Sequence, residues 1–441
     1  MTLDPILLGS LIRQRRKELG LTLNDLANEN ISVPTISNIE RGITGNVISD
    51  KVAYIREKLG LTDEMVEKML QKTEVEQECF ARQISFIRHL GELELYDEAR
   101  KEVSALERDE RLNEFPLFAA TAQLLKGIVL RKQGQWDRAK KALHQVLRLL
   151  QEDDLDDATN LAAEAYFNLA LIFVLGDQDY EQGIAYSDKA LAEFCEDGEE
   201  THLKGQILYG KGAYYFYLEQ YAEAFRYAME AREACESSHD VKNLLLTYNL
   251  EALVLKRQHL YDQAFTVFQQ AVDLARKCCA EPWIGSVLYL NLGDAHFHKK
   301  MYDQALRYYD ISYNLCRKTN DEHQRATLYY SYGEVYYETK QYDKAEEYAN
   351  KATKLAQKFN LTSEYLPLLL LRAQIASGKN SDEVKAICEK GMQLAERSKL
   401  LNKKKDFHFV LANYHNRIGD REAFLHETEN MFNIESITRR R

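Results

Sequence analysis

An aromatic residue followed by Asp-x-Ala recurs along this chain at an almost constant spacing. Seven copies begin 40 to 44 residues apart, at Tyr96, Trp136, Tyr180, Tyr221, Tyr261, Tyr302 and Tyr342, and two fainter copies begin at Ser381 and Asp420. The copies at Tyr180 (Tyr-Glu-Gln-Gly) and Tyr221 (Tyr-Ala-Glu-Ala) keep the aromatic but not the aspartate. Repeats of roughly 20 to 50 residues are helical units that bury their apolar faces only by stacking on one another. The spacing therefore predicts an all-α array of about nine helix pairs.

The composition favours helical structure, and the charge distribution limits where a nucleic acid could bind. Only five prolines and twenty glycines occur in 441 residues, and the abundant Ala, Leu, Glu, Lys and Gln favour helix. Residues 1–72 carry ten basic and ten acidic side chains, so the remaining 48 basic and 59 acidic residues hold the whole formal charge of −11. Because that larger part repels nucleic acid, DNA is expected to bind only the first 72 residues.

The sequence gives no sign of a catalytic centre. Its seven cysteines are scattered without CxxC pairs, as is typical of reduced thiols in a cytoplasmic protein. We find no signal peptide and no run of 18 apolar residues. A phosphate-binding Gly-rich loop, HExxH and GxSxG are also lacking. We therefore expect a cytoplasmic protein that is not an enzyme and needs no cofactor or metal.

The first 72 residues do not share the repeat. They predict five short helices, over residues 5–19, 22–28, 33–41, 49–59 and 62–72. Thr22 with Asp25 has the spacing of a capping box, and Gly42 suits the position just after a helix. Because no Pro/Gly/Ser-rich linker follows, the last helix is expected to continue into the first repeat. The predicted domains are 1–72 and 73–441, the latter with two degenerate repeats at its end.

Small residues stand at fixed distances from the leading aromatic. Glycine is common nine residues before it (Gly127, Gly212, Gly293, Gly333), and alanine is common three residues after it (Ala99, Ala139, Ala224, Ala264, Ala305, Ala345). Small residues at both points let the two helices of a pair approach closely. This pattern resembles the tetratricopeptide repeat (TPR), with helices longer than in the form of about 34 residues. The resemblance covers about residues 75–433 and implies a right-handed superhelix.

Residues 21–27 and 34–42 read Leu-Thr-Leu-Asn-Asp-Leu-Ala and Pro-Thr-Ile-Ser-Asn-Ile-Glu-Arg-Gly. They resemble the helix-turn-helix of the lambda-repressor/Xre family, whose second helix enters the major groove. The resemblance implies base contacts from Pro34, Thr35 and Asn38, since an Asn amide can pair with adenine. It also implies DNA contacts, mostly to phosphates, from five further residues: Arg13, Arg16, Thr22, Ser32 and Arg41.

The turn between these two helices differs from the family's pattern. It is one residue shorter and has no glycine, so we expect Asn30 to adopt the left-handed conformation. Because residues 1–72 have no net charge, a single copy should bind DNA weakly, and a dimer on a palindromic double-stranded site is expected. The alternative is a helical cap of the repeats that binds no DNA.

In TPR proteins the first helix of each pair lines a concave groove. Its inward positions correspond to 12, 11, 8 and 5 residues before the leading aromatic, and in the central repeats they include Asn168, Tyr209, Phe216, Asn249, Lys256, Asn291, Asp294, Phe297, Tyr330, Glu334 and Tyr337. Asparagines there can clamp a peptide backbone, aromatics can form pockets, and Asp294 or Glu334 can take an amino terminus or a basic side chain. As alternatives, each Asn makes a hydrogen bond within its repeat and the tyrosines are packing residues.

An Xre-type helix-turn-helix followed by about nine such repeats resembles the RRNPP group of peptide-pheromone receptors. The NprR type is the most similar, with the Rgg, PlcR, PrgX, AimR and Rap types as relatives. The resemblance implies a cytoplasmic quorum-sensing transcription regulator that binds a short imported signalling peptide and forms homodimers or peptide-dependent tetramers. Two alternatives stay open: a Rap-like modulator that dephosphorylates or sequesters a response regulator, and a TPR scaffold for other proteins.

Overall fold

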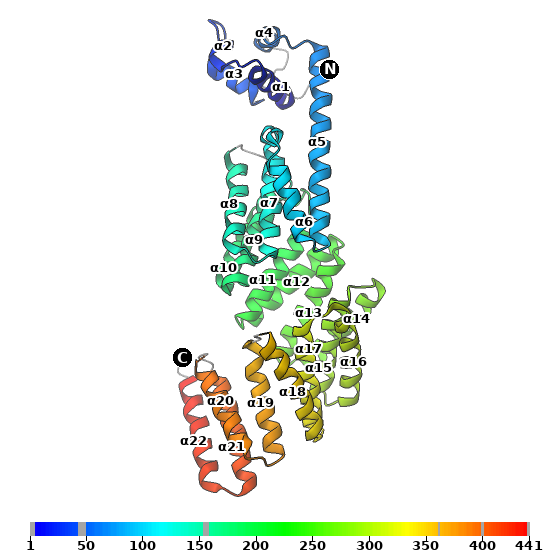
Figure 1. Cartoon of the computed structure of the whole chain (residues 1–441), viewed down its shortest axis with the longest axis vertical. Coiled ribbons are helices and arrows are strands. Elements are labelled where there is room, and N and C mark those ends of the chain that lie inside the picture. The colour runs from blue at the N-terminus through cyan, green and yellow to red at the C-terminus, as the bar shows by residue number, and fades with distance from the viewer. Residues whose placement is uncertain (1–4, 43–49, 153–157, 360–361, 398–400, 439–441) are drawn as a thin grey trace. The chain divides into compact units, whose positions relative to one another are not determined.

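The computed structural model describes residues 5–42, 50–152, 158–359, 362–397 and 401–438. Within these ranges it contains 22 α-helices, one 3-10 helix and an isolated β-bridge (Figure 1). The chain divides into two compact units, residues 1–157 and 158–441. The predicted all-α class is confirmed.

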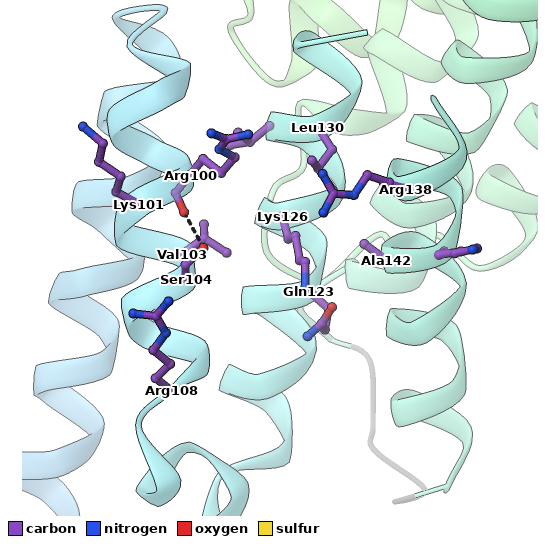
Figure 2. A pocket seen from close by; sticks show the side chains of 12 residues that line it. Arg100, Lys101, Val103, Ser104, Arg108, Gln123, Lys126, Leu130, Arg138 and Ala142 are labelled. Carbon is purple, nitrogen blue, oxygen red and sulfur yellow. Dashed lines mark hydrogen bonds between the residues drawn. The ribbon is translucent and has the colours of Figure 1, made fainter. Parts of the chain in front are cut away.

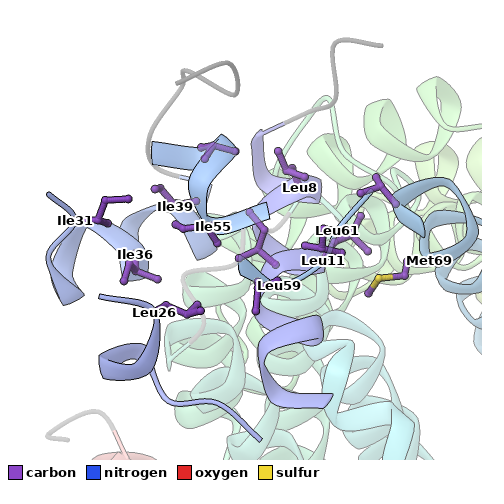
Figure 3. Packing of buried hydrophobic residues seen from close by; sticks show 13 residues of the cluster. Leu8, Leu11, Leu26, Ile31, Ile36, Ile39, Ile55, Leu59, Leu61 and Met69 are labelled. Atoms are coloured by element: carbon purple, nitrogen blue, oxygen red, sulfur yellow. The ribbon is translucent and has the colours of Figure 1, made fainter. Parts of the chain in front are cut away.

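The first unit begins with four short helices. They are α1 (Pro5–Glu18), α2 (Leu23–Leu26), α3 (Val33–Glu40) and α4 (Asp50–Lys58). Their apolar faces enclose one core, which includes Leu8, Leu11, Leu26, Ile31, Ile36, Ile39, Ile55 and Leu59 (Figure 3). The predicted caps are confirmed: Thr22 and Asp25 form a capping box, and Gly42 has a φ of 69°. This segment has the helix order predicted for a helix-turn-helix.

The turn between α2 and α3 is closed by Asn28 and not by Asn30. The Asn28 side-chain oxygen accepts hydrogen bonds from the backbone N–H groups of Asn30 (2.8 Å) and Ile31 (2.9 Å). Asn30 does not have a positive φ. The expectation of a left-handed Asn30 was wrong because an Asn side chain two residues earlier supplies the hydrogen bonds that a turn needs.

Helix α5 (Asp63–Glu92) is one continuous helix of 30 residues. Its first turns complete the N-terminal core with Val66 and Met69, and its second half contributes Phe80 and Ile84 to the core of the first repeats. The predicted junction helix is therefore confirmed. The boundary that the sequence places after residue 72 lies inside this helix.

Nine helix pairs are present in the described residues. In the first pair α5 packs against α6 (Tyr96–Glu107), and η1 (Glu110–Glu114) connects it to the second. The other pairs are α7 (Pro116–Lys132) with α8 (Trp136–Glu152), α9 (Leu161–Asp177) with α10 (Tyr180–Ala192), α11 (Leu203–Tyr217) with α12 (Tyr221–Ser237), α13 (Val241–Arg257) with α14 (Tyr261–Lys277), α15 (Pro282–His298) with α16 (Tyr302–Thr319), α17 (Glu322–Glu338) with α18 (Tyr342–Lys358), α19 (Thr362–Gly378) with α20 (Glu383–Arg397), and α21 (Leu401–Ile418) with α22 (Arg421–Thr438). The predicted number of pairs is confirmed.

The leading aromatic is the first residue of the second helix in each of the first seven pairs. Two residues before it the backbone is left-handed, at Glu94, Gly134, Gln178, Glu219, His259, Lys300 and Lys340. A left-handed residue after a helix ends it and reverses the chain. In the last two pairs the left-handed residues are Asn380 and Gly419, and the second helices begin without an aromatic.

Gly293 shows why small residues are needed within a pair. A Cβ atom on this residue of α15 would lie 2.5 Å from the Cε1 ring atom of Tyr309 in α16. A Cβ atom on Gly127 of α7 would lie 2.7 Å from the Leu143 side chain of α8. Both distances are too short for real atoms, so the helices of these pairs approach as closely as the sequence predicts.

Candidate functional sites

The predicted groove residues lie on the first helices of five successive pairs, α9, α11, α13, α15 and α17. Neighbouring first helices contact one another, α11 with α13, α13 with α15, and α15 with α17. Residues about one repeat apart are therefore brought together. Asn291 and Asn249 are the clearest case, since Nδ2 of Asn291 donates a hydrogen bond to Oδ1 of Asn249 at 2.7 Å. Each amide keeps a further polar group with which to meet a peptide backbone.

The Asn168 side chain makes its hydrogen bond within its own helix, unlike those of Asn249 and Asn291. It is buried in α9, and its Nδ2 donates a hydrogen bond to the backbone oxygen of Glu164, one turn earlier, at 2.8 Å. This is the hydrogen bond within the repeat that the sequence left open as an alternative. Asn168 is therefore the least available of the three amides.

Asp294 is the centre of a polar cluster that four helices build. The Lys256 ammonium of α13 lies 3.0 Å from Oδ2 of Asp294 in α15. The Tyr309 hydroxyl of α16 donates to Oδ1 at 2.9 Å, and the Ser331 hydroxyl of α17 donates to the same atom at 3.5 Å. The four offsets exclude Tyr309, which lies on a second helix. Ser331 stands 11 residues before Tyr342, at one of the offsets, but was not selected as a candidate.

Glu334 lies on the same face, in α17. The Tyr330 hydroxyl donates a hydrogen bond to Oε1 of Glu334 at 2.7 Å. Burial raises the pKa of Glu334 to about 7, and the negative charge of Asp294 adds to the increase against the opposing effects of Tyr330 and Lys256. No described Lys, Arg or His side chain forms a salt bridge with Glu334. A cationic ligand would favour the ionised form of this carboxyl group.

The aromatic candidates pack within their own repeats. Phe216 contacts Tyr221, Phe297 contacts Tyr302 and Tyr337 contacts Tyr342, with ring centroids 5.8, 5.8 and 6.0 Å apart. In each case a ring predicted to face the groove, near the end of the first helix, contacts the leading aromatic that begins the second helix. Tyr209 packs against two hydrophobic clusters, and burial raises its pKa to about 12. The packing role that the sequence left open for the tyrosines is the one observed here.

Most DNA-binding candidates of the N-terminal segment are on its surface. Arg13, Thr22, Ser32, Pro34 and Arg41 are exposed, and Thr35 and Asn38 are half-buried. Arg41 donates a hydrogen bond to the Asn38 side-chain oxygen at 3.3 Å, and the Ser32 and Thr35 hydroxyl oxygens lie 2.9 Å apart. These contacts place the four side chains in two adjacent polar pairs.

Arg16 is the exception, because its side chain is paired within the segment. Its Nε and Nη2 donate to the two carboxylate oxygens of Glu40 at 2.6 and 2.9 Å, and its Nη1 donates to the Leu21 backbone oxygen at 2.9 Å. The Arg16 side chain is only 12% exposed and that of Glu40 only 5%. These contacts use three of the five N–H groups of the guanidinium, so a phosphate contact of Arg16 stays a prediction.

No group of three or more His, Cys, Asp or Glu side chains in the described ranges is placed to hold a metal ion. None of the described helices combines the length and apolarity needed to cross a membrane. Burial raises the pKa of the Cys235 and Cys388 thiols to about 12, so both stay protonated at neutral pH.

Comparison with known proteins supports the assignment of the repeats. Residues 203–277 and 284–358, which span α11 to α18, match the family model of the tetratricopeptide repeat. Among curated proteins no sequence matches the chain.

Three solved structures have the same fold. Aspartyl phosphate phosphatase F from Bacillus subtilis is 17% identical, over 81% of this chain and 94% of that one, with a TM-score of 0.53. The apo form of the quorum sensor NprR from B. thuringiensis is 15% identical, over 82% and 99%, with a TM-score of 0.61. NprR in complex with its cognate peptide NprX is 17% identical, over 78% and 97%, with a TM-score of 0.53.

Because these sequence identities are only 15–17%, the similarity shows a shared fold and nothing finer. The chain is an all-α protein with tetratricopeptide repeats. Its predicted resemblance to the RRNPP receptors is confirmed at the level of the fold, because a quorum sensor of that group is similar to it over most of both chains.

Proposed function

We propose that the chain is a cytoplasmic quorum-sensing transcription regulator. It binds a short imported signalling peptide on the face formed by α13, α15 and α17, and it couples that binding to sequence-specific recognition of double-stranded DNA by residues 1–72. The observation that carries the proposal is the juxtaposition of the Asn249–Asn291 pair, Asp294 and Glu334 on three contacting first helices. A peptide is the ligand of NprR, a protein of the same fold.

The chemistry of this face defines the peptide it would take. The two amides hold the peptide backbone through one donor and one acceptor. Glu334, whose pKa is about 7, receives the amino terminus or a basic side chain of the peptide. Because the bound cation favours the ionised carboxylate, affinity should increase as the pH rises from 6 to 8.

The test replaces both amides, as Asn249→Ala with Asn291→Ala. The probes are synthetic peptides that tile any short secreted precursor encoded beside this gene, titrated by calorimetry. Loss of two hydrogen-bonded contacts should weaken binding at least tenfold at unchanged helix content. The matched control is Asn350→Ala, an exposed asparagine of α18. Equal affinity of the double variant and the control would place the peptide elsewhere.

Coupling to DNA requires two states that the peptide binds unequally. A coupling of roughly 1–3 kcal/mol gives a 5- to 150-fold change in DNA affinity. Thr35→Ala with Asn38→Ala should abolish sequence-specific retention of operator DNA at physiological salt, because each base contact supplies about 1–3 kcal/mol of discrimination. Asn24→Ala, an exposed asparagine on α2, serves as the control. Retention that survives the double variant would favour the helical-cap alternative.

Homodimers are part of the proposal, and the last pair of helices supplies the surface for them. Phe409 of α21 and Leu425 and Phe432 of α22 are 54, 53 and 72% exposed. Large apolar side chains exposed together often mark an interface. Phe432→Glu should shift the mass measured by light scattering from dimer to monomer, whereas a dimer that persists would exclude this face.

A Rap-like role is the second candidate, because an aspartyl phosphate phosphatase has the same fold. In this reading the partner is a response regulator. Phosphoryl loss from phosphorylated response regulators of the same organism, measured with and without the chain, distinguishes the two. Acceleration of that loss by the chain would establish the second role.

A further inference from the structure

A groove with six basic side chains lies on the first two helix pairs. It has a volume of about 760 Å³ and runs between α6 and α8, with α7 along its floor. The cations are Arg100, Lys101, Arg108, Lys126, Arg138 and Lys141. Figure 2 labels Arg100, Lys101, Arg108, Lys126 and Arg138, with Arg138 extending from α8 toward α7. We call this feature the basic groove.

The charge of the basic groove is largely uncompensated. Of its six cations only Lys126 forms a salt bridge among the described residues, with Glu107 at 2.7 Å. Arg138 donates a hydrogen bond to the neutral side chain of Gln135 at 2.9 Å. None of the residues that line the groove is acidic. In a chain with a net charge of −11, such a concentration of unpaired cations is a strong local attraction for an anionic partner.

The floor of the basic groove is apolar. Val103, Val129, Leu130 and Ala142 line it, and all four are at most 5% exposed. Because these four residues are already covered, a ligand meets the exposed cations and the hydrocarbon stems of their side chains. Duplex DNA or free phosphate would meet the charges and leave the stems uncovered, so an acidic protein segment with aliphatic side chains fits better.

The basic groove is distinct from the predicted peptide groove. Its walls are the second helices of two pairs, whereas the peptide positions lie on first helices. On α7 the inward positions, counted from Trp136, are Leu124, Leu125, Ile128 and Arg131, and none of them lines the basic groove. A ligand there would therefore not compete with the signalling peptide.

We propose that the basic groove docks an acidic amphipathic segment of a partner protein. Carboxylates of the segment pair with Arg100 on one wall and with Arg138 and Lys141 on the other, and its aliphatic side chains pack on the hydrocarbon stems of these cations. From Arg100 to Arg108 the wall is about 12 Å long at roughly 1.5 Å per residue, which accommodates two turns of helix. This inference does not depend on the proposed function.

The test uses the full chain and a fluorescein-labelled helical peptide of about 14 residues, with a leucine stripe flanked by glutamates. Arg100→Glu with Lys141→Glu reverses one charge on each wall. The control Arg82→Glu with Arg148→Glu makes the same charge change at exposed residues of α5 and α8 that do not line the groove. Fluorescence anisotropy should show at least a tenfold loss of affinity for the groove variant and less than a twofold loss for the control.

Three further measurements decide between this partner and simpler explanations. A scrambled peptide of equal composition should bind at least tenfold more weakly, and equal binding would reduce the groove to non-specific charge attraction. Neither inorganic phosphate nor duplex DNA without an operator should displace the peptide at equal ionic strength, and displacement by DNA would make the groove a DNA contact. Arg100→Lys with Lys141→Arg should retain binding, which excludes misfolding as the cause of the loss.

Discussion

Two carboxyl groups, the buried Glu40 in α3 and the half-buried Glu334 in α17, have opposite surroundings. Glu40 accepts two hydrogen bonds from the Arg16 guanidinium, so its charge is fully matched inside the N-terminal segment. Glu334 accepts one hydrogen bond from the Tyr330 hydroxyl, and no salt bridge joins it to a described basic side chain. A buried carboxylate has to be paired or protonated. In the N-terminal segment Arg16 pairs with the carboxylate of Glu40. In the central repeats the carboxyl group of Glu334 is either protonated or paired with the cation of a ligand.

The two carboxyl groups differ in whether the protein itself supplies the paired cation. The positive charge of Lys256 lowers the pKa of Glu334, but its ammonium pairs with Asp294, which also accepts from Tyr309. Among the described residues Glu334 therefore has no salt bridge of its own. A cationic ligand would supply one on this partly buried face.

The largest expected effect is a loss of stability when the Arg16–Glu40 salt bridge is broken. Glu40→Ala leaves the Arg16 charge buried without a partner, which typically costs about 3–5 kcal/mol. Hydrogen exchange of α1 and α3 in the full chain should rise accordingly, while α17 keeps its protection. Glu18→Ala, which removes the exposed Arg15–Glu18 pair, should cost less than about 1 kcal/mol. Equal losses in the two variants would mean that Arg16–Glu40 is not the organising contact of this segment.

The second effect concerns Glu334 and depends on pH. A carboxyl group whose folded pKa is raised from 4.5 to about 7 contributes its full stability below pH 4.5 and loses it as the pH rises through 7. Glu334→Gln removes that loss, so it should leave stability unchanged near pH 5 and increase it above pH 7. The gain is at most about 3 kcal/mol, since each pKa unit corresponds to about 1.4 kcal/mol.

Thermal unfolding at pH 5 and pH 8 checks this prediction. The matched control is Glu338→Gln, an exposed residue one turn further along α17. The Glu334 variant should unfold at a higher temperature than the native chain at pH 8 only. A shift of equal size at both pH values would show that the charge of Glu334 is not the cause.

The repeat could be predicted from the sequence because one local signal recurs in it. The leading aromatic begins the second helix of each of the first seven pairs, so counting from Tyr261 or Tyr302 placed the helices correctly. Caps such as Thr22 with Asp25 were also predictable, since their partners lie three residues apart. The number of helix pairs and the N-terminal helix order followed from these short-range signals.

The contacts within the candidate sites could not be predicted in the same way. The pairing of Arg16 was missed because nothing in the sequence shows that Glu40, 24 residues later, folds onto it. An offset predicts which face a side chain occupies, but not that Phe297 packs against Tyr302. The Asp294 cluster needed Tyr309, which comes from a second helix.

The third-largest expected effect is a loss of stability at the close contact between α15 and α16, which positions Asp294. Gly293→Ala places a Cβ atom 2.5 Å from the Tyr309 ring and should cost about 1–3 kcal/mol through overpacking. Because Tyr309 donates to Asp294, exchange should rise across α15 and α16 together. Gly285→Ala, on the same helix, meets only the flexible end of Leu315 at 3.1 Å and should be nearly neutral. If both substitutions were neutral, the close approach would not be needed.

The smallest effect on stability belongs to the Asn249–Asn291 hydrogen bond. A double-mutant cycle with Asn249→Ala and Asn291→Ala should give a coupling of about 0.5–1.5 kcal/mol in hydrogen exchange of α13 and α15, the usual net value of one neutral hydrogen bond. Peptide affinity should fall by much more than this coupling explains, because the two amides bind the ligand as well as each other. A loss of affinity no larger than the coupling would make the pair structural, as Arg16–Glu40 is, and would leave Glu334 as the group on this face to test for peptide binding.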